Sequence, residues 1–217
     1  MTVFDPGTLR VYVVTSGAFA GRSHAAVALA AIDGGATAVQ LRAPELDDDE
    51  LLTVARELAP RCAAAGVLFV VNDRPAVAVL SSADGAHVGQ GDDRENARAT
   101  LGPDRVLGIS VTSASEARAA VDRGADYLGV TVWATPTKPE APPGGIELVR
   151  EVAGIVAVPV VGIGGIDPSN AADVIAAGAA GVAVISAVAA APDPVAATRD
   201  LARAVGAPAT PGGRRTA

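Results

Sequence analysis

The sequence has a single cysteine, Cys62, among its 217 residues, which excludes an internal disulfide framework. It has only two histidines, His24 and His87, so a zinc site built on histidine and cysteine is not expected. Positive charge is scarce as well, because 17 Lys and Arg stand against 24 Asp and Glu, a formal net charge of −7. Undirected attraction to nucleic acid or to an anionic membrane surface is therefore not expected.

Export and membrane signals are also missing. The opening residues 1–10 carry an acid and a proline where a secretory signal has basic and then apolar residues, so we expect a cytoplasmic protein. Residues 174–191 are uncharged, but they consist mostly of Ala and Gly, which contribute little transfer energy. Gly178 and Gly181 stand where a helix would pass into a strand. This stretch is predicted to be a buried strand between two helices.

What the chain does contain is a recurring unit: an alanine-rich amphipathic helix, a glycine stop and a short β-branched run. A helix over His24–Asp33 ends at glycines 34–35, and a helix over Asp49–Ala65 ends at Gly66. Glycine suits these stops because the residue after a helix commonly adopts a left-handed conformation. With 50% hydrophobic and 19% charged residues, the composition is that of a soluble globular chain with a large core.

The β-branched runs predict eight strands, at residues 10–15, 37–42, 67–72, 85–89, 105–110, 124–130, 158–165 and 178–186. They are continuously apolar rather than alternating, which is typical of a covered parallel sheet. Eight β/α units predict an α/β fold of the (β/α)8 TIM-barrel type. The open doubly wound sheet is the alternative, but it normally has fewer strands, and no GxGxxG turn follows the first one. We expect one barrel domain over residues 1–205 and a flexible C-terminal tail over residues 206–217.

Polar residues follow the apolar runs, where a barrel has its active site. They are Gln40, Arg42, Asn72, Asp73, Gln90, Asp92, Ser110, Thr135, Thr137, Lys138 and Ser186. Two carboxylates on adjacent strand ends suit Mg²⁺, which takes few protein oxygens and completes its shell with water and phosphate. The pattern therefore indicates an anionic ligand bound together with a metal ion.

Structural explanations remain open for these residues individually. Asp73 and Asp92 alternatively cap the helices that follow them, and Ser110 is alternatively an N-cap or a turn residue. Asn72 is alternatively a turn residue, and Arg42 alternatively pairs with Glu45 on the surface.

The loop at residues 162–165, GIGG, has the composition of a phosphate site. The loop after the seventh strand of a barrel, with the region after the eighth, is where phosphate most often binds. Glycines let the backbone approach the oxygens, and a helix from Asp167 would add its positive end, with Ser186 alongside. A tight turn alone is the alternative explanation of the glycines. Trp133 is expected either to anchor its loop or to cover a flat heterocycle.

Eight segments in order resemble the thiamine phosphate synthase family: VQLR, VNDR, GAHVGQGD, GIS, GADYLGV, TPTK, VPVVGIGGI and GVAVIS, between residues 39 and 186. The likeness runs from about residue 9 to residue 187. Its most specific element is TPTK (135–138) between the GADY strand and the GIGG turn. The resemblance implies a transferase that joins a hydroxymethylpyrimidine diphosphate to a thiazole phosphate and releases pyrophosphate, with one Mg²⁺ per subunit.

The resemblance also implies roles for individual residues. Asp73 and Asp92 would hold the metal. The pyrimidine diphosphate would be bound by Gln40, Arg42, Asn72, Ser110 and Lys138, of which Lys138, Arg42 and Ser110 would be catalytic. The thiazole phosphate would be bound by Thr135, Thr137, Gly165, Ile185 and Ser186. The expected partners are small phosphorylated molecules, and the oligomeric state stays open because related barrels often assemble.

The sequence departs from the family pattern in three segments. Ala43 and Pro44 replace an acid and a lysine after VQLR, the segment that contains Thr131 and leads to TPTK is one residue shorter than usual, and VTS replaces VTD at residues 14–16. A related thiazole tautomerase, a non-catalytic binder of a phosphorylated heterocycle and a sugar-phosphate barrel enzyme are the alternative functions. The tautomerase typically has a histidine after the fifth strand, where residues 110–115 have none. The sugar-phosphate enzyme would not explain Asp73 together with Asp92.

Overall fold

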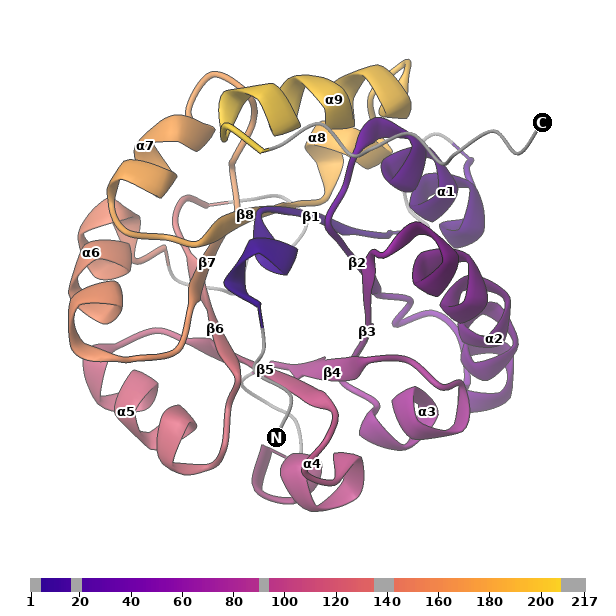
Figure 1. The fold of residues 1–217 in the computed structure, drawn as a ribbon, viewed down its shortest axis with the longest axis horizontal. Coiled ribbons are helices and arrows are strands. Elements are labelled where there is room, and N and C mark those ends of the chain that lie inside the picture. Colours follow the sequence, from indigo (N-terminus) through magenta and orange to yellow (C-terminus); the bar gives the residue numbers. More distant parts are fainter. Residues whose placement is uncertain (1–4, 17–20, 90–93, 135–142, 208–217) are drawn as a thin grey trace.

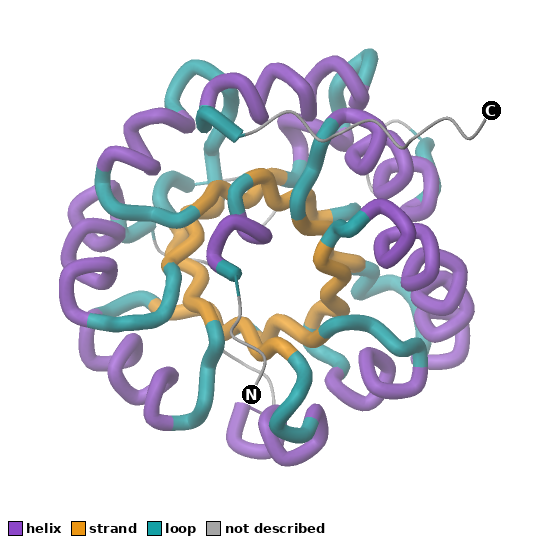
Figure 2. The backbone as a smooth tube through the Cα atoms, viewed as in Figure 1, coloured by secondary structure: helices purple, strands orange, loops and turns teal. Residues whose placement is uncertain are grey.

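The structure is a computed structural model that describes residues 5–16, 21–89, 94–134 and 143–207. Eight parallel strands follow one another around a closed barrel, each hydrogen-bonded to its sequence neighbours, and β8 closes onto β1 (Figures 1 and 2). The strands are β1 Val11–Val14, β2 Ala38–Leu41, β3 Leu68–Asn72, β4 Gly85–Val88, β5 Val106–Val111, β6 Tyr127–Thr131, β7 Val160–Ile163 and β8 Gly181–Val184. The predicted (β/α)8 fold is confirmed.

Helices surround the barrel as an outer ring (Figure 2). They are α1 His24–Gly34, α2 Asp48–Ala65, α3 Pro75–Leu80, α4 Arg94–Leu101, α5 Ala114–Asp122, α6 Gly145–Ile155, α7 Ala171–Ala176, α8 Ser186–Ala189 and α9 Pro194–Ala204, while a short 3-10 helix, η1 Pro6–Leu9, precedes β1. The predicted glycine stops are confirmed, since α1 ends at Gly35 and α2 at Gly66, both left-handed (φ 94° and 68°). Asp47 starts α2 as the first half of a capping box with Glu50.

Two separate apolar layers explain why the strands are continuously hydrophobic. Side chains alternate between the two faces of a strand. One face packs against the helices in the large outer core, and the other fills the barrel interior. The inner layer consists of Leu9, Tyr12, Val14, Ala38, Tyr127, Val161 and Ala183. Because both faces are buried, alternation of apolar and polar residues is lost.

The amino-terminal helix η1 lies over the opening of the ring of strands in Figures 1 and 2. Its N-cap is Asp5, whose side chain accepts a hydrogen bond from the Gly7 N–H at 2.8 Å. Leu9 at its end is fully buried and belongs to the inner layer. This helix therefore covers the mouth at the amino-terminal ends of the strands and leaves the opposite mouth for a ligand.

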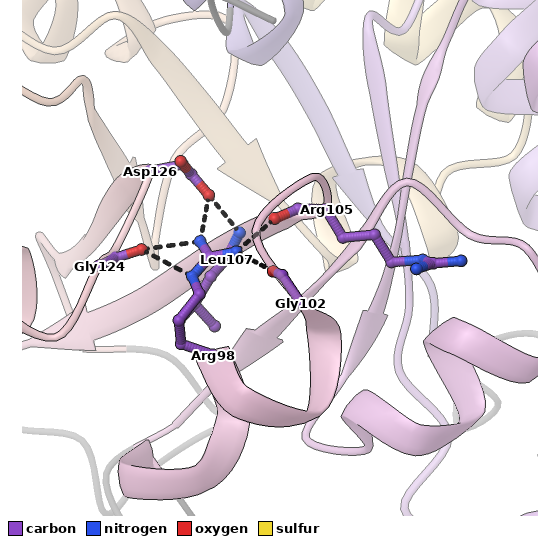
Figure 3. Close-up of polar contacts among 6 residues, drawn as sticks. All are labelled: Arg98, Gly102, Arg105, Leu107, Gly124 and Asp126. Carbon is purple, nitrogen blue, oxygen red and sulfur yellow. Dashed lines mark hydrogen bonds and ion pairs between the residues drawn. The ribbon is translucent and has the colours of Figure 1, made fainter. Parts of the chain in front are cut away.

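An arginine clamp holds the same amino-terminal rim between α4, β5 and β6 (Figure 3). The Arg98 guanidinium donates to the carbonyls of Gly102, Arg105 and Gly124, and to Oδ2 of Asp126 at 2.6 Å. The same Asp126 oxygen accepts the N–H of Leu107 at 2.8 Å. One side chain thus joins three successive chain segments before the strands begin.

The uncharged stretch at residues 174–191 divides as expected. It contains the end of α7, the buried strand β8 and the short helix α8. Among the described residues, none of the helices has the length and apolar character needed to cross a membrane. Of the predicted tail, residues 208–217 lie outside the described residues.

Candidate active site

Eight of the predicted site residues are described, and all lie at the carboxyl ends of the strands: Gln40, Arg42, Asn72, Asp73, Ser110, Gly165, Ile185 and Ser186. Four predicted residues lie outside the described part of the chain: Asp92, Thr135, Thr137 and Lys138. Gln40 is two residues beyond the inner-layer Ala38, so its side chain faces the barrel interior. The GIGG turn follows β7 and therefore lies at the same mouth as Asp73, as predicted.

Asp73 is held in an unusual position after β3. Its backbone has φ +61°, a conformation rarely adopted by a residue other than glycine, and its N–H donates to the His87 carbonyl at 2.8 Å. Its Oδ1 accepts the Gly89 N–H at 3.0 Å, and its Oδ2 accepts from the Asn72 amide. The capping alternative is wrong, because the N-cap of α3 is Arg74. These contacts instead tie the carboxylate to the end of β4, where the chain leads on to Asp92.

Arg42 lies just beyond β2, beside a buried histidine. His24, the first residue of α1, is 7% exposed and contacts Thr15 Oγ1 at 2.9 Å and Glu45 Oε1 at 2.7 Å. Partial desolvation acts to raise the pKa of Glu45, but the hydrogen bond and charge of His24 and the charge of Arg42 outweigh it and lower that pKa. Glu45 thus pairs with His24 and not with Arg42. Within the described ranges, the Arg42 guanidinium makes no hydrogen bond or ion pair.

Gln40 and Ser110 face each other through a chain of hydrogen bonds across the barrel interior. Gln40 Nε2 donates to the Tyr12 hydroxyl at 2.8 Å, and the Tyr12 and Tyr127 hydroxyls lie 2.9 Å apart. Tyr127 reaches His87 Nδ1 at 3.0 Å, and His87 Nε2 reaches Ser110 Oγ at 2.9 Å. The capping alternative for Ser110 is wrong, because it lies within β5.

The N-cap of the following helix, α5, is Ser113. Asn72 is the last residue of β3, and its side-chain amide donates a hydrogen bond to the Asp73 carboxylate. Asn72 is therefore a strand-end residue that helps to place this carboxylate.

The glycine turn after β7 has the backbone that its sequence predicts. Gly164 and Gly165 have φ +94° and +65°, and Gly165 is exposed at the mouth. The expected helix from Asp167 is wrong, because α7 begins at Ala171. The Asp167 side chain accepts from the N–H and hydroxyl of Ser169, which forms a local turn before the helix. Backbone N–H groups of the turn, and not a helix end, are therefore what this loop offers to an anion.

Ile185 and Ser186 lie on the neighbouring strand end. Ile163 pairs with Ala183, so Ile185 is the inner-face position two residues farther on, next to the glycine turn. Ser186, the first residue of α8, is exposed. These two residues and the turn form one continuous edge of the mouth.

Trp133 packs against this edge from the loop after β6. It belongs to the partly buried residues on the outer core, and a Cβ added at Gly165 would lie 2.8 Å from its own Cβ. This packing favours the expectation that Trp133 anchors its loop. It also gives Gly165 a second reason to be glycine, namely close approach.

The fold and the site define a (β/α)8 barrel whose strand ends gather carboxylate, amide, hydroxyl and guanidinium groups at the open mouth. The family model described as "Thiamine monophosphate synthase" matches residues 11–188, and the chain belongs to this family.

It is 48% identical over 202 residues to a thiamine-phosphate synthase of Roseiflexus sp. (strain RS-1), covering 91% of this chain and 86% of the relative. It is 49% identical over 197 residues to one from Methanoregula boonei, covering 89% and 91%. A solved thiamine phosphate pyrophosphorylase from Pyrococcus furiosus superposes with a TM-score of 0.86 at 36% identity, covering 93% of this chain and 97% of that one.

Sequence reasoning missed two groups at this mouth. His24 joins the ends of β1 and β2 through Thr15 and Glu45, and His87 links Ser110 to the inner layer. His87 lies in β4, and its partners Tyr127 and Ser110 lie on β6 and β5. The alternation of side chains about β4 was the available signal, since it directs residue 87 into the barrel.

Proposed function

We propose that this chain is a thiamine-phosphate synthase, a transferase that acts on two small phosphorylated molecules. It joins a hydroxymethylpyrimidine diphosphate to a thiazole phosphate, giving thiamine phosphate and pyrophosphate. The observation that carries the proposal is the family match over residues 11–188, which spans all eight strands and both edges of the mouth. The strand-end residues are chemically suited to this reaction.

The reaction makes few demands on proton transfer. The bond between the pyrimidine methylene carbon and the diphosphate oxygen breaks, and its electron pair leaves with pyrophosphate. The electron-rich aminopyrimidine stabilises the resulting cation, and the thiazole nitrogen supplies the pair for the new C–N bond. Positioning of two rings and neutralisation of the leaving group therefore dominate catalysis.

The pyrimidine diphosphate is assigned to the half of the mouth formed by β2 to β5. Gln40 and Ser110 bind the pyrimidine ring, and Asn72 and Arg42 lie toward the diphosphate, with Lys138 supplying a second cation. Arg42 suits this role because, in the part of the chain that the structure describes, its guanidinium is not engaged by an acid. The thiazole phosphate is assigned to the turn at Gly165 with Ile185, Ser186, Thr135 and Thr137.

Asp73 and Asp92 are assigned to Mg²⁺. The oxygens of Asp73 fit a hard cation, and the Gly89 N–H and the Asn72 amide orient them without neutralising their charge. Mg²⁺ takes few protein oxygens and completes its shell with water and phosphate, so two carboxylates suffice for such a site. When bound, Mg²⁺ would neutralise charge on the departing pyrophosphate.

Lys138 is the only lysine of the chain, among 17 basic residues of which 16 are arginine. A compact ammonium acts as a point charge that a planar guanidinium does not replace. This composition also makes the residue addressable, because an amine-selective reagent has only Lys138 and the terminal amine to modify.

The test is the release of pyrophosphate in step with thiamine phosphate by purified protein with both substrates and Mg²⁺. We expect Lys138→Ala to lower kcat about 10²-fold or more, by analogy with loss of a preorganised electrostatic group. Asp73→Asn should raise the Mg²⁺ concentration needed for half activity, and chelation should abolish turnover. Asp122→Asn, an exposed position at the far end of α5, is the matched control.

Binding of thiazole phosphate without turnover would overturn the assignment in favour of a non-catalytic binder. Isomerisation of the thiazole alone would indicate the tautomerase. Unchanged turnover in Lys138→Ala would remove that residue from the mechanism while leaving the overall reaction in place.

A further inference from the structure

Arg42 is the one cation of an otherwise acidic segment. Residues 40–50 contain this arginine and five acids, all of them between residues 45 and 50. A guanidinium so close in the chain to several carboxylates is expected to form an ion pair with one of them. Within residues 40–50, all of which the structure describes, no carboxylate pairs with Arg42. The nearby acids are instead engaged by other groups.

The acids at the start of α2 are used by the helix and by a neighbouring arginine. Asp47 is the N-cap of α2 and accepts the Glu50 N–H at 2.9 Å, while Glu50 Oε2 accepts the Asp47 N–H at 3.1 Å. Asp48 pairs with Arg74, whose Nε lies 3.2 Å from Asp48 Oδ1. Glu45 lies before the helix and is not used in this way.

Glu45 is the acid that would compete for Arg42. It follows Arg42 by three residues, and its side chain is 51% exposed. Partial desolvation raises the pKa of Glu45, but the hydrogen bond and charge of His24 and the charge of Arg42 lower it, and the net shift is downward. The carboxylate is therefore ionised at neutral pH. An ionised carboxylate next to an arginine would form an exposed ion pair with it if nothing held either group.

The imidazole of His24 takes up one oxygen of the Glu45 carboxylate. His24 Nε2 lies 2.7 Å from Glu45 Oε1, and because a carboxylate only accepts, the proton of this bond belongs to Nε2. The other ring nitrogen, Nδ1, lies 2.9 Å from Thr15 Oγ1. His24 is 7% exposed and Thr15 is fully buried. The ring is therefore held at both nitrogens in a packed position.

The same threonine places the backbone of Arg42. Thr15 Oγ1 accepts the Arg42 N–H at 3.2 Å, and the Thr15 N–H donates to the Gln40 carbonyl at 2.8 Å. These bonds join the ends of β1 and β2 at the point where the chain leaves the barrel. His24 therefore fixes Glu45 with respect to the backbone that carries Arg42.

We propose that His24 is a positioning residue that withholds Glu45 from Arg42 and so keeps the guanidinium available to the diphosphate of the substrate. Without His24, Glu45 would pair with Arg42, and the diphosphate would have to displace the carboxylate. This inference rests on the proposed function for the identity of the anion. His24 is assigned no contact with the substrate and acts through Glu45 and Arg42.

A purely structural role of His24 predicts a different result. Loss of its contact with Thr15 would disturb the mouth whether or not Glu45 is present. Withholding of Glu45 predicts instead that removal of the acid restores what the loss of His24 takes away. The two contacts can be separated, because asparagine matches the position of Nδ1 and glutamine that of Nε2. His24→Asn therefore loses the contact with Glu45, and His24→Gln retains a donor for it.

The first test measures the binding of inorganic pyrophosphate, with Mg²⁺, to the full chain by titration calorimetry. We expect His24→Asn to raise the Kd about fivefold, the effect of one exposed ion pair that the ligand must break. In the Glu45→Gln background the same change should alter the Kd by less than about twofold. The conservative variant His24→Gln should bind as the unaltered protein does. Asp48→Asn is the matched control, since this acid is paired with Arg74 and its removal should not rescue His24→Asn.

Steady-state kinetics give a second readout that a disturbed mouth would not reproduce. His24→Asn should raise the KM for the pyrimidine diphosphate about fivefold and leave the KM for thiazole phosphate unchanged. A rise in both KM values would overturn the proposal.

Nitrogen-15 NMR of the unaltered, ligand-free protein gives a check that needs no folded variant at residue 24. The sequence has only two histidines, so replacement of either one assigns both signals. We expect Nε2 of His24 to carry a proton, because it donates to Glu45. An Nε2 without a proton would overturn the proposal.

The outcomes separate this inference from the proposed function. Pyrophosphate binding that follows the expected pattern, in a protein that forms no thiamine phosphate, would defeat the function and support the inference. Thiamine phosphate formation with an unchanged Kd in His24→Asn would overturn the inference alone. An equal loss with and without Glu45→Gln would make the role of His24 structural and would also overturn the inference, as would absence of pyrophosphate binding by the unaltered protein.

Discussion

Removal of the Arg98 side chain tests the division of the barrel into a stability face and a chemical face. Arg98 makes five hydrogen bonds at the amino-terminal rim, four to backbone carbonyls and one to Asp126 (Figure 3). In Arg98→Ala these acceptors lose their donor, and α4 is no longer joined to the starts of β5 and β6. The mouth that carries Gln40 and Asp73 lies at the other end of the strands.

The expected loss in the free energy of unfolding depends on how far solvent reaches the hydrogen bonds of Arg98. The Arg98 side chain is 24% exposed and that of Asp126 is 36% exposed, so each freed carbonyl regains part of its hydrogen bonding from solvent. We assign about 0.5 kcal/mol to each carbonyl contact and about 1 kcal/mol to the carboxylate, in total roughly 2–3 kcal/mol. For a chain of this size that corresponds to a fall in Tm of about 4–12 °C.

The free energy of unfolding is measured by equilibrium denaturation, and an unchanged denaturant slope m shows that the two-state comparison is valid. Steady-state kinetics are measured at denaturant concentrations below the unfolding transition. Arg105→Ala is the matched control, because the Arg105 side chain points away from the cluster in Figure 3 and only its backbone carbonyl takes part. The control should lose less than about 0.5 kcal/mol. An equal loss in both variants, or a changed KM in Arg98→Ala, would refute the reasoning.

Two further predictions concern titratable groups outside the inner layer. Because the pKa of Glu45 is lowered from 4.5 in the folded protein, its contribution to the free energy of unfolding is full above about pH 4.5 and is lost as the pH falls through the lowered value. The difference in denaturation midpoint between the unaltered protein and Glu45→Gln should therefore vanish in acid, and a difference that grows there would contradict it. Burial, and then the charge of Asp84, raises the pKa of Cys62 to about 12, so a thiol-reactive disulfide should modify it only at the rate of unfolding, and rapid modification of the native protein would be inconsistent with this environment.

The fold follows from the sequence because its signals are local. Each strand is a short run of residues buried on both faces, and the first two helices of the barrel, α1 and α2, end at Gly35 and Gly66. The wrong prediction of a helix start at Asp167 also has a local cause. Asp167 and Ser169 form a turn by side-chain to backbone bonds, and the start of α7 is delayed to Ala171 because that turn competes with the helix.

The site is less accessible to sequence reasoning, because its partners are far apart in the chain. Strand-end positions such as Gln40 and Ser110 are found by counting from each apolar run. The pairing of Tyr12 with Tyr127 spans 115 residues and depends on the closure of the barrel. The sequence of an apolar run does not reveal whether the hydroxyl of a tyrosine in it has a hydrogen-bond partner inside the protein or is exposed to solvent.

The hydrogen-bonded groups of the inner layer carry a cost for folding. An inner layer of apolar residues alone would bury no hydroxyl groups and would risk no unpaired donor. The barrel instead places two phenols and an imidazole there, and these groups are tolerated because each accepts and donates in a completed series. Loss of any one member removes a hydrogen bond from another group in the barrel interior, so breaking the series costs stability.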